Sequence, residues 1–194
     1  RYSIPPMKAV QLLSQGVSGK FQFTEVPDPR PEPDEVVVRV RACGLNHLDL
    51  WVEETDGLPL DVELPRIPGC EIAGEVAELG ADVDQWRIGD RVAVQSNLFC
   101  GGCEYCGRGE EANCLKTRLI GVECDGGFAE LAKAPSRCLV ALPDGVSFET
   151  SAALSLAGST AMHMLTDRAE VRPGDWALVV GAASGVGSAA IQIA

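Results

Sequence analysis

Basic residues are scarce in this sequence. Lysine and arginine total 16 against 28 aspartates and glutamates, which gives a formal net charge of -12. Proteins that bind nucleic acid draw much of their affinity from lysine and arginine against phosphate, and anionic membrane surfaces attract the same cations. The acidic balance therefore argues against a nucleic-acid or membrane partner, and it is typical of a soluble protein with a well-solvated surface.

Long apolar runs are also missing. No stretch approaches the ~20 residues that a membrane-spanning helix needs, and Arg1–Pro6 lacks the apolar centre of a secretory signal. The missing signal predicts a cytoplasmic protein, in which thiols stay reduced. The eight cysteines are therefore expected to be metal ligands or small buried side chains rather than disulfides. Because a strand-like segment begins at Met7, residues 1–6 are interpreted as an appended leader.

The first part of the chain is predicted to be mainly β. Glu35–Ala42 alternates in polarity and is rich in valine, as expected of a half-buried strand. Further short strands, bounded by glycine, proline or aspartate, are predicted at Gly74–Leu79, Arg91–Val94 and Cys138–Leu142. Many short strands between turns are typical of a barrel-like domain, which we place at residues 7–146.

The pattern changes after residue 146. Ser147–Leu165 is rich in alanine, leucine and serine, and it predicts a helix that begins at Ser147. Trp176–Val180 is predicted to be a short apolar strand that leads into a glycine-rich turn and a final helix. Residues 147–194 therefore resemble the start of an α/β domain. A complete doubly wound sheet would need roughly 100 further residues, so we expect this chain alone to be inactive.

Four cysteines give the strongest chemical signal. They follow the pattern Cys100-x2-Cys103-x2-Cys106-x7-Cys114 inside a polar, glycine-rich segment, residues 96–116, called the zinc lobe below. Four thiolates complete a tetrahedral zinc shell and leave no open position, which is typical of a structural site. A nucleic-acid-binding zinc ribbon is the alternative, but it should be basic. The charges of the lobe and the residues just after it are balanced instead: Glu104, Glu110 and Glu111 against Arg108, Lys116 and Arg118. We predict one structural zinc.

A second signal is the glycine-rich turn between the last predicted strand and helix. Glycines in such a turn let backbone amides approach a pyrophosphate, and the N-terminus of the helix favours its negative charge. A tight strand-to-helix turn packed on a core would have a similar sequence. The predicted cofactor-binding residues of the turn are Gly181, Ser184, Gly185, Val186 and Gly187.

The order of these features resembles the medium-chain dehydrogenase/reductase superfamily, which includes zinc-containing alcohol dehydrogenases and quinone oxidoreductases. The resemblance covers essentially the whole chain. It implies a mainly β GroES-like barrel domain followed by a Rossmann domain, of which this chain holds the start. It also implies hydride transfer between NAD(P)H and a small-molecule substrate, and a homodimer or homotetramer. Local agreement is dense at Pro68–Glu71, Trp86–Val92, Gly126–Glu130, Leu142–Gly145 and Gly181–Gly187.

The sequence departs from the zinc alcohol dehydrogenases at their catalytic metal site. In the family's Cys-x-Thr/Ser-Asp stretch, the ligand position is Asn46 here and the proton-relay position is Leu48. The Gly-His-Glu box becomes Gly69-Cys70-Glu71, and the third ligand position falls near Leu156. A catalytic zinc needs about three protein ligands and an open position. Since Cys70 alone of these would bind metal well, the resemblance shifts toward the quinone oxidoreductase and enoyl reductase branch.

In that branch the cofactor reduces an electron-poor alkene, quinone or carbonyl, while hydrogen-bond donors stabilise the developing enolate. The resemblance points to Asn46 as the substrate-facing donor, although a turn asparagine that satisfies local backbone is the alternative. It places His47 near the cofactor pyrophosphate and Thr160 near the nicotinamide. The alternatives are an exposed histidine without a partner and a helical threonine bonded to its own backbone. His163 is interpreted as structural.

Two other functions stay open. A zinc-dependent alcohol dehydrogenase would need a displaced catalytic zinc bound by Cys43, Cys70 and Glu71, whereas unpaired cysteines more often behave as small buried hydrophobic residues. A non-enzymatic relative would bind NADPH without turning over a substrate. The acidic residue that would distinguish NAD from NADP is expected about 20 residues after the glycine-rich turn, so the preferred cofactor is undetermined.

Overall fold

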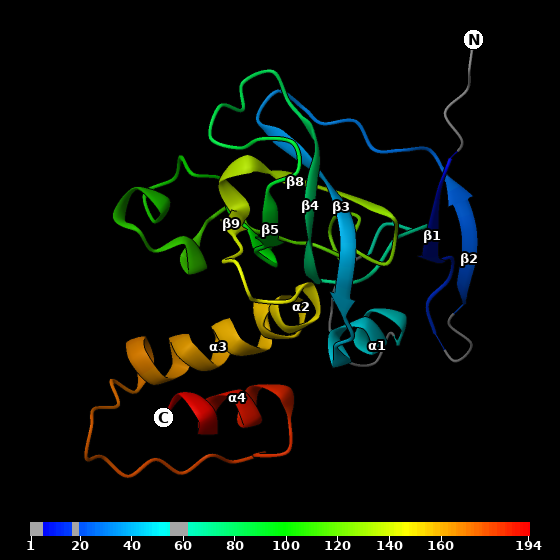
Figure 1. Cartoon of the computed structure of the whole chain (residues 1–194). Coiled ribbons are helices and arrows are strands. Elements are labelled where there is room, and N and C mark those ends of the chain that lie inside the picture. Colours follow the sequence, from blue (N-terminus) through cyan, green and yellow to red (C-terminus); the bar gives the residue numbers. More distant parts are fainter. Residues whose placement is uncertain (1–5, 17–19, 55–61) are drawn as a thin grey trace.

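A computed structural model describes residues 6–16, 20–54 and 62–194 of the protein. The interpretation of residues 1–6 as a leader falls, apart from Pro6, outside the described residues. The centre of the fold is a five-stranded antiparallel sheet with the strand order β8-β3-β4-β5-β9 (Figure 1). Its strands are β3 (Glu35–Gly44), β4 (Glu71–Leu79), β5 (Arg91–Val94), β8 (Leu131–Pro135) and β9 (Leu139–Ala141).

Strand β3 is the longest strand and the one that organises the sheet. Val36, Val37 and Val38 are all buried, because side chains on both of its faces are covered. The strand continues two residues beyond the predicted end at Ala42 and pairs Gly44 with Glu71, the first residue of β4. This extra pairing brings a carboxylate against the end of β3.

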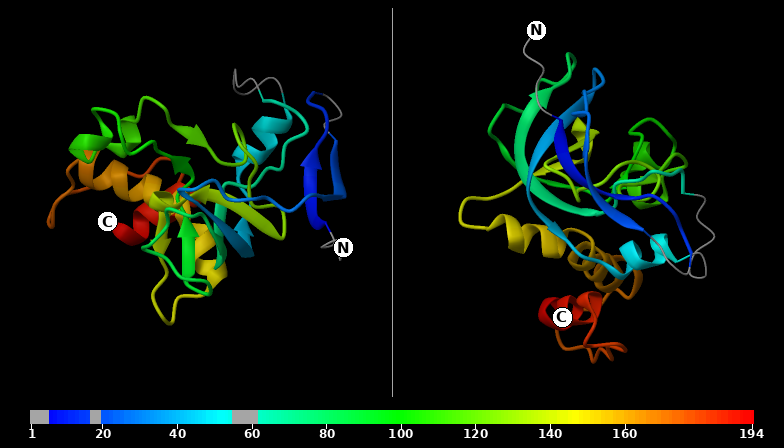
Figure 2. Two further views of the ribbon diagram at one scale, coloured as in Figure 1. Left: turned by 90° about the horizontal axis from the view of Figure 1, so that it is seen from above. Right: turned by 90° about the vertical axis from the view of Figure 1, so that its right-hand side faces the viewer.

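A two-stranded ribbon, β1 (Met7–Leu12) and β2 (Phe21–Val26), lies beside the sheet (Figures 1 and 2). A bridge between Ala9 and Ala129 links this ribbon to the chain just before β8. The zinc lobe lies at the opposite side of the sheet from the ribbon (Figure 1). Its short elements are β6 (Asn97–Leu98), η1 (Cys106–Arg108) and η2 (Glu111–Asn113), and β7 (Arg118–Leu119) follows it and pairs with β6. The prediction of a mainly β domain is confirmed.

The helices lie at one end of the sheet (Figure 1). Helix α3 packs side by side with α4 (Figures 1 and 2). Within the described residues, no helix is both long enough and apolar enough to cross a membrane. The helical segments are α1 (His47–Glu53), α2 (Phe148–Ser155), α3 (Ala157–His163), η4 (Met164–Arg168) and α4 (Gly185–Ile193).

The predicted helix Ser147–Leu165 begins where expected but is interrupted. The Ser147 hydroxyl accepts the backbone N–H of Thr150 at 3.1 Å and caps α2. The break at Leu156 has a tertiary cause, because the N–H groups of Leu156 and Ala157 donate to the Glu71 carboxylate. A side chain inserted into the helical hydrogen-bond ladder interrupts the helix at that point.

The prediction of a strand at Trp176–Val180 is wrong. These residues are in no strand of the described structure, and the side chains of Trp176, Leu178 and Val180 are exposed. A strand is stabilised by hydrogen bonds to a neighbouring strand, and no described strand lies beside this segment. Val179 alone packs inward, against a small cluster of buried alanines on α3 and α4.

Candidate functional site

The four cysteines of the zinc lobe converge as predicted. Their Sγ atoms all lie within 4.8 Å of one another. The Sγ–Sγ distances are 4.0 Å for Cys100 and Cys106, 3.5 Å for Cys103 and Cys106, and 4.0 Å for Cys103 and Cys114. Sulfurs bound to one tetrahedral zinc at about 2.3 Å would be about 3.8 Å apart. The lobe therefore has the geometry of a structural zinc site.

Backbone amides in the lobe favour thiolates. Gly102 donates its N–H to Cys100 Sγ at 3.4 Å, and Cys100 donates its own to Cys114 Sγ at 3.3 Å. The N–H of Cys106 lowers the pKa of Cys103 to about 6, whereas burial raises the pKa of Cys106 to about 12. Four adjacent thiolates repel one another, so one sulfur keeps its proton until a divalent cation binds.

Two glycines of the glycine-rich turn are required by its backbone geometry. Gly181 has a φ of 75°, and a Cβ on Gly187 would overlap the carbonyl oxygen of Gly181. Ser184 caps α4 by accepting the Gly187 N–H at 3.0 Å. Gly181, Ser184 and Gly185 are exposed, whereas Val186 is half-buried. The first residues of α4 are therefore accessible, and a helix N-terminus attracts anions such as a pyrophosphate.

Asn46 sits at the N-terminus of α1 in a network of backbone hydrogen bonds. Its N–H donates to Asp49 Oδ2 at 2.8 Å, and Asp49 Oδ1 accepts the N–H of Gly69 at 3.2 Å. Asp49 is buried, and burial raises the pKa of its carboxyl although these two N–H groups oppose the shift. His47 follows Asn46 with an exposed side chain. This network fixes the backbone that carries both predicted residues.

Glu71 is the most enclosed acidic side chain of the site, with 3% of its surface exposed. Oε1 accepts the N–H groups of Leu156 and Ala157, each at 3.1 Å. Burial raises the pKa of the carboxyl, while the hydrogen bonds from Ala157, Leu156 and the Asn46 side chain oppose that shift. The carboxylate therefore binds the backbone at Leu156, one of the three positions at which the resemblance expects a metal ligand in zinc alcohol dehydrogenases.

The third of these positions, Cys70, belongs to the main hydrophobic core, and Cys43 packs against the same core. Burial raises the pKa of each thiol to about 12, so both are protonated at neutral pH. Within the described part of the chain, the zinc lobe is the one place that gathers three or more side chains able to hold a metal. Cys43, Cys70 and Glu71 do not form a second such group.

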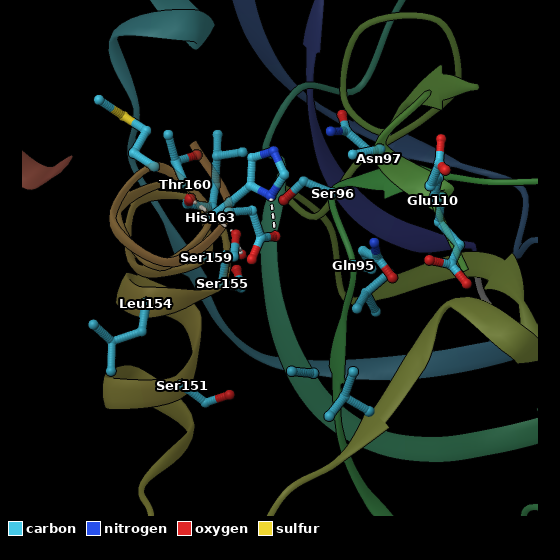
Figure 3. A pocket seen from close by; sticks show the side chains of 18 of the residues that line it. Gln95, Ser96, Asn97, Glu110, Ser151, Leu154, Ser155, Ser159, Thr160 and His163 are labelled. Atoms are coloured by element: carbon cyan, nitrogen blue, oxygen red, sulfur yellow. Dashed lines mark hydrogen bonds and ion pairs between the residues drawn. The ribbon is translucent and has the colours of Figure 1, made fainter. Parts of the chain in front are cut away.

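Two cavities flank this cluster. One, of about 950 Å³, lies between α2–α3, the end of β5 and the zinc lobe, and Thr160 and His163 line it (Figure 3). His163 Nδ1 is 2.7 Å from an Asp167 oxygen. The other, of about 720 Å³, is mostly apolar and includes Asn46 and His47. The structure thus places Asn46 and Thr160 on different cavities rather than in one.

Sequence reasoning missed part of the larger cavity wall. Gln95 and Ser96 line the cavity between β5 and β6, and Ser96 Oγ donates to the Cys70 carbonyl at 2.6 Å. These residues follow a short strand and belong to no recognisable motif. Their position depends on the pairing of β4 with β5, which no local pattern in the sequence specifies.

Comparison with known proteins decides the family. The alcohol dehydrogenase GroES-like domain matches residues 32–144. The chain belongs to the medium-chain dehydrogenase/reductase superfamily. The resemblance expected from the sequence is therefore confirmed, together with the GroES-like fold class.

Relatives across this superfamily resemble nearly the whole chain. An alcohol dehydrogenase of Schizosaccharomyces pombe is 38% identical over 182 residues, which is 93% of this chain and 51% of the relative. The crystal structure of an NAD-dependent alcohol dehydrogenase has a TM-score of 0.89 at 39% identity, with 96% of this chain and 54% of that one covered. A cobalt- and zinc-bound alcohol dehydrogenase from Pyrobaculum aerophilum gives 0.87 at 35% identity, with 96% and 56% covered. The chain spans about half the length of these relatives.

Membership in the medium-chain superfamily allows two parts of the chain to be compared: the zinc lobe, and the residues that correspond to the catalytic zinc site of zinc alcohol dehydrogenases. The zinc lobe gathers four thiols within 4.8 Å of one another. The positions at which the resemblance expects catalytic ligands hold an amide, a core thiol and a leucine, at Asn46, Cys70 and Leu156. An amide and a hydrocarbon are poor ligands for zinc, which prefers thiolate, imidazole and carboxylate.

Proposed function

We propose that this protein is an NAD(P)H-dependent oxidoreductase that reduces quinones, enones or carbonyls by hydride transfer without a catalytic zinc. The observation that carries the proposal is the donor set at Asn46, Cys70 and Leu156. It offers one thiol among three positions, whereas a catalytic zinc needs about three protein ligands. The relatives named alcohol dehydrogenase support the oxidoreductase class.

Each candidate site residue of the chain has a separate proposed role. When bound, the nicotinamide cofactor supplies the hydride. The exposed amides at the start of α4 would hold its pyrophosphate, and exposed His47 would add a positive charge there when protonated. Thr160 would border the nicotinamide from the larger cavity. Asn46 would donate an N–H to the substrate oxygen as negative charge develops on it.

Zinc has a separate role in this account. Four cysteine ligands close its shell, so it would stabilise the zinc lobe and bind no substrate. We propose one such zinc per chain. All eight cysteines are unpaired, which supports a reducing compartment such as the cytoplasm. We further propose a domain boundary between residues 146 and 147, and a homodimer or homotetramer for the complete protein.

The direct test is a panel of acceptors. The complete protein, loaded with zinc in the lobe, would be assayed for oxidation of NADPH and NADH by quinones, enones and aldehydes. We expect turnover with at least one of these classes, and we expect it to survive a chelator mild enough to leave the lobe zinc in place. Cofactor binding without turnover of any acceptor would contradict the proposal and favour a non-enzymatic relative.

The second candidate is a zinc-dependent alcohol dehydrogenase with displaced ligands. The names of the relatives favour it, since one solved structure is described as cobalt- and zinc-bound. The displaced ligands would have to be Cys43, Cys70 and Glu71, and both thiols are packed in the core. Complete loss of alcohol oxidation under the same mild chelation would support this candidate over the first.

A further inference from the structure

Arg137 contacts the backbone next to a zinc ligand, although it lies outside the zinc lobe. It belongs to the 3-10 turn η3 (Ser136–Cys138), which precedes β9. Its Nε donates to the carbonyl oxygen of Phe99 at 2.9 Å, and Cys138 Sγ is a more distant donor to the same oxygen at 3.8 Å. A Cβ on Gly101 would lie 3.0 Å from Arg137 Cδ. The arginine side chain therefore runs directly against the loop between the first two ligands.

The peptide unit that accepts this hydrogen bond also donates one to a ligand sulfur. Phe99 supplies its carbonyl oxygen, and its N–H belongs to Cys100 and donates to Cys114 Sγ at 3.3 Å. Hydrogen bonds in a chain polarise one another, so a cation at the carbonyl oxygen makes the N–H of the same peptide a stronger donor. The guanidinium of Arg137 is thus connected to the Cys114 sulfur through a single peptide unit.

Asp34, which immediately precedes β3, fixes the other side of the guanidinium. Its Oδ2 lies 2.6 Å from Arg137 Nη1, and its carbonyl oxygen accepts the N–H of Ser136 at 2.9 Å. The two side chains of the ion pair are 34% and 55% exposed, and exposed ion pairs contribute little to stability. The main effect of Asp34 is therefore to orient the guanidinium toward the lobe.

The centre of a zinc-loaded lobe is anionic, because four thiolates outweigh the charge of one Zn²⁺. Hydrogen bonds to the sulfurs offset this excess of negative charge. The N–H groups that donate to them include those of Cys100, Gly102 and Lys116. Of these three, Cys100 is the one whose peptide carbonyl oxygen accepts from an arginine.

We propose that Arg137 is a positioning residue of the structural zinc site, which strengthens zinc binding by holding and polarising the peptide unit between Phe99 and Cys100. The inference goes beyond the proposed hydride transfer and rests on the proposal that the lobe binds one zinc. Groups outside the ligand shell commonly change the affinity of a metal site about 10- to 100-fold. Through Arg137 and Asp34, the affinity of the lobe for zinc depends on its contact with the central sheet.

Zinc affinity of the complete protein tests the proposal. Arg137→Met keeps an unbranched side chain against the loop but has no donor for Phe99 or Asp34. We expect competition with a chromogenic chelator to give a zinc Kd about 10- to 100-fold higher than in wild type. Arg137→Lys keeps the charge and can still donate to Phe99, so its Kd should lie between the two. A Kd for Arg137→Met within about twofold of wild type would overturn the proposal.

Arg108→Met is the matched control for charge. Arg108 lies inside the lobe, where its guanidinium covers the Tyr105 ring at 4.9 Å and pairs with Glu110 at 3.4 Å. The substitution removes the same positive charge but leaves the carbonyl of Phe99 bonded to Arg137, so the zinc Kd should stay within about twofold of wild type. An equal loss of affinity in both variants would assign the effect to net charge and overturn the role of the peptide unit.

Cobalt substitution gives a readout that a loss of stability alone would not change. With Co²⁺ in the lobe, the thiolate-to-cobalt charge-transfer absorption depends on hydrogen bonding to the sulfurs. A weaker bond to Cys114 should move this band to lower energy in Arg137→Met and leave it in place in Arg108→Met. If Arg137→Met does not fold, Asp34→Asn replaces it, because the guanidinium then loses its anchor and the band should move in the same direction. An unchanged band would overturn the proposal.

These measurements also separate this inference from the proposed function. A wild-type protein that binds zinc but turns over no acceptor would refute the proposed reaction alone. A wild-type protein that binds no zinc would refute the metal site and the role of Arg137 together. Bound zinc with the same Kd and the same cobalt spectrum in Arg137→Met would refute the role of Arg137 whatever the activity.

Discussion

Ser96 donates a hydrogen bond from Oγ to the carbonyl oxygen of Cys70 at 2.6 Å, and both residues are almost completely buried. The bond fixes the backbone of Cys70 against the connection between β5 and β6. The thiol of Cys70 packs in the main hydrophobic core. A sulfur held in this way stabilises the fold by packing.

The two core thiols should be chemically silent in the native protein. Burial raises the pKa of Cys43 and Cys70 to about 12, and alkylation requires the thiolate. Because the shift is upward, both thiols stay protonated until the pH approaches that value. At pH near 8, mass spectrometry after iodoacetamide treatment should find both residues unmodified. Denatured protein is the control and should be modified at all eight cysteines, whereas rapid native labelling of Cys70 would contradict its place in the core.

Loss of one lobe ligand should remove the zinc. Cys103→Ser replaces a thiolate ligand with a hydroxyl, which binds zinc poorly. We expect the zinc content to fall from about one per chain to near zero, with faster proteolysis within residues 96–116. Elemental analysis and limited proteolysis measure the two effects. Cys124→Ser is the matched control, since Cys124 lies outside the cluster. Full zinc content in Cys103→Ser would show that the metal is bound elsewhere.

A methyl group at Gly187 should weaken cofactor binding. The added Cβ would overlap the carbonyl oxygen of Gly181, so the glycine-rich turn would have to open. Such overpacking costs on the order of 1–3 kcal/mol, and we expect the Kd for NADPH to rise about 5- to 150-fold. Fluorescence titration measures the change. Gly107→Ala, whose Cβ would face open space, should bind as wild type does. Equal affinity in Gly187→Ala would contradict the proposed pyrophosphate site.

Removal of the Asn46 amide should lower the rate without loosening the cofactor. Asn46→Ala removes the proposed donor to the substrate oxygen, and we expect kcat/KM for an enone or aldehyde to fall about 100- to 1000-fold. Asn46→Asp keeps the size and a capping oxygen at the start of α1 but has no N–H to donate, so it should be equally impaired. Steady-state kinetics with both variants provides the measurement. Wild-type kcat/KM in Asn46→Asp would rule out donation by this amide.

The sequence predicted those parts of the fold that depend on local pattern. The valines of β3, the Ser147 cap and the four cysteines each specify their structure within a few residues, and each was located from the sequence. The predicted end of β3 came two residues too early, because the pairing of Gly44 with Glu71 depends on a strand 27 positions further along the sequence. Strand β9 covers Leu139–Ala141 and is one residue shorter at each end than the predicted Cys138–Leu142, because Cys138 belongs to the 3-10 turn Ser136–Cys138.

The local sequence pattern could predict neither the break in the helix at Leu156 nor the absence of a strand at Trp176–Val180. The helix is interrupted because Glu71, far away in the sequence, accepts the N–H of Leu156. Residues 176–180 have the composition of a buried strand but no neighbour to pair with among the described strands. The same distinction between local pattern and tertiary contact applies to the candidate site. Its residue types were visible in the sequence, whereas the hydrogen bonds from Leu156 and Ala157 to Glu71 required the structure.

The zinc content of the complete, catalytically active protein tests the central claim most directly. Elemental analysis of protein that oxidises NADPH with a quinone, enone or aldehyde should give about one zinc per chain, since the lobe alone gathers a full set of ligands among the described residues. A value of two zinc per chain, with turnover lost as the second is removed, would contradict hydride transfer without a catalytic metal.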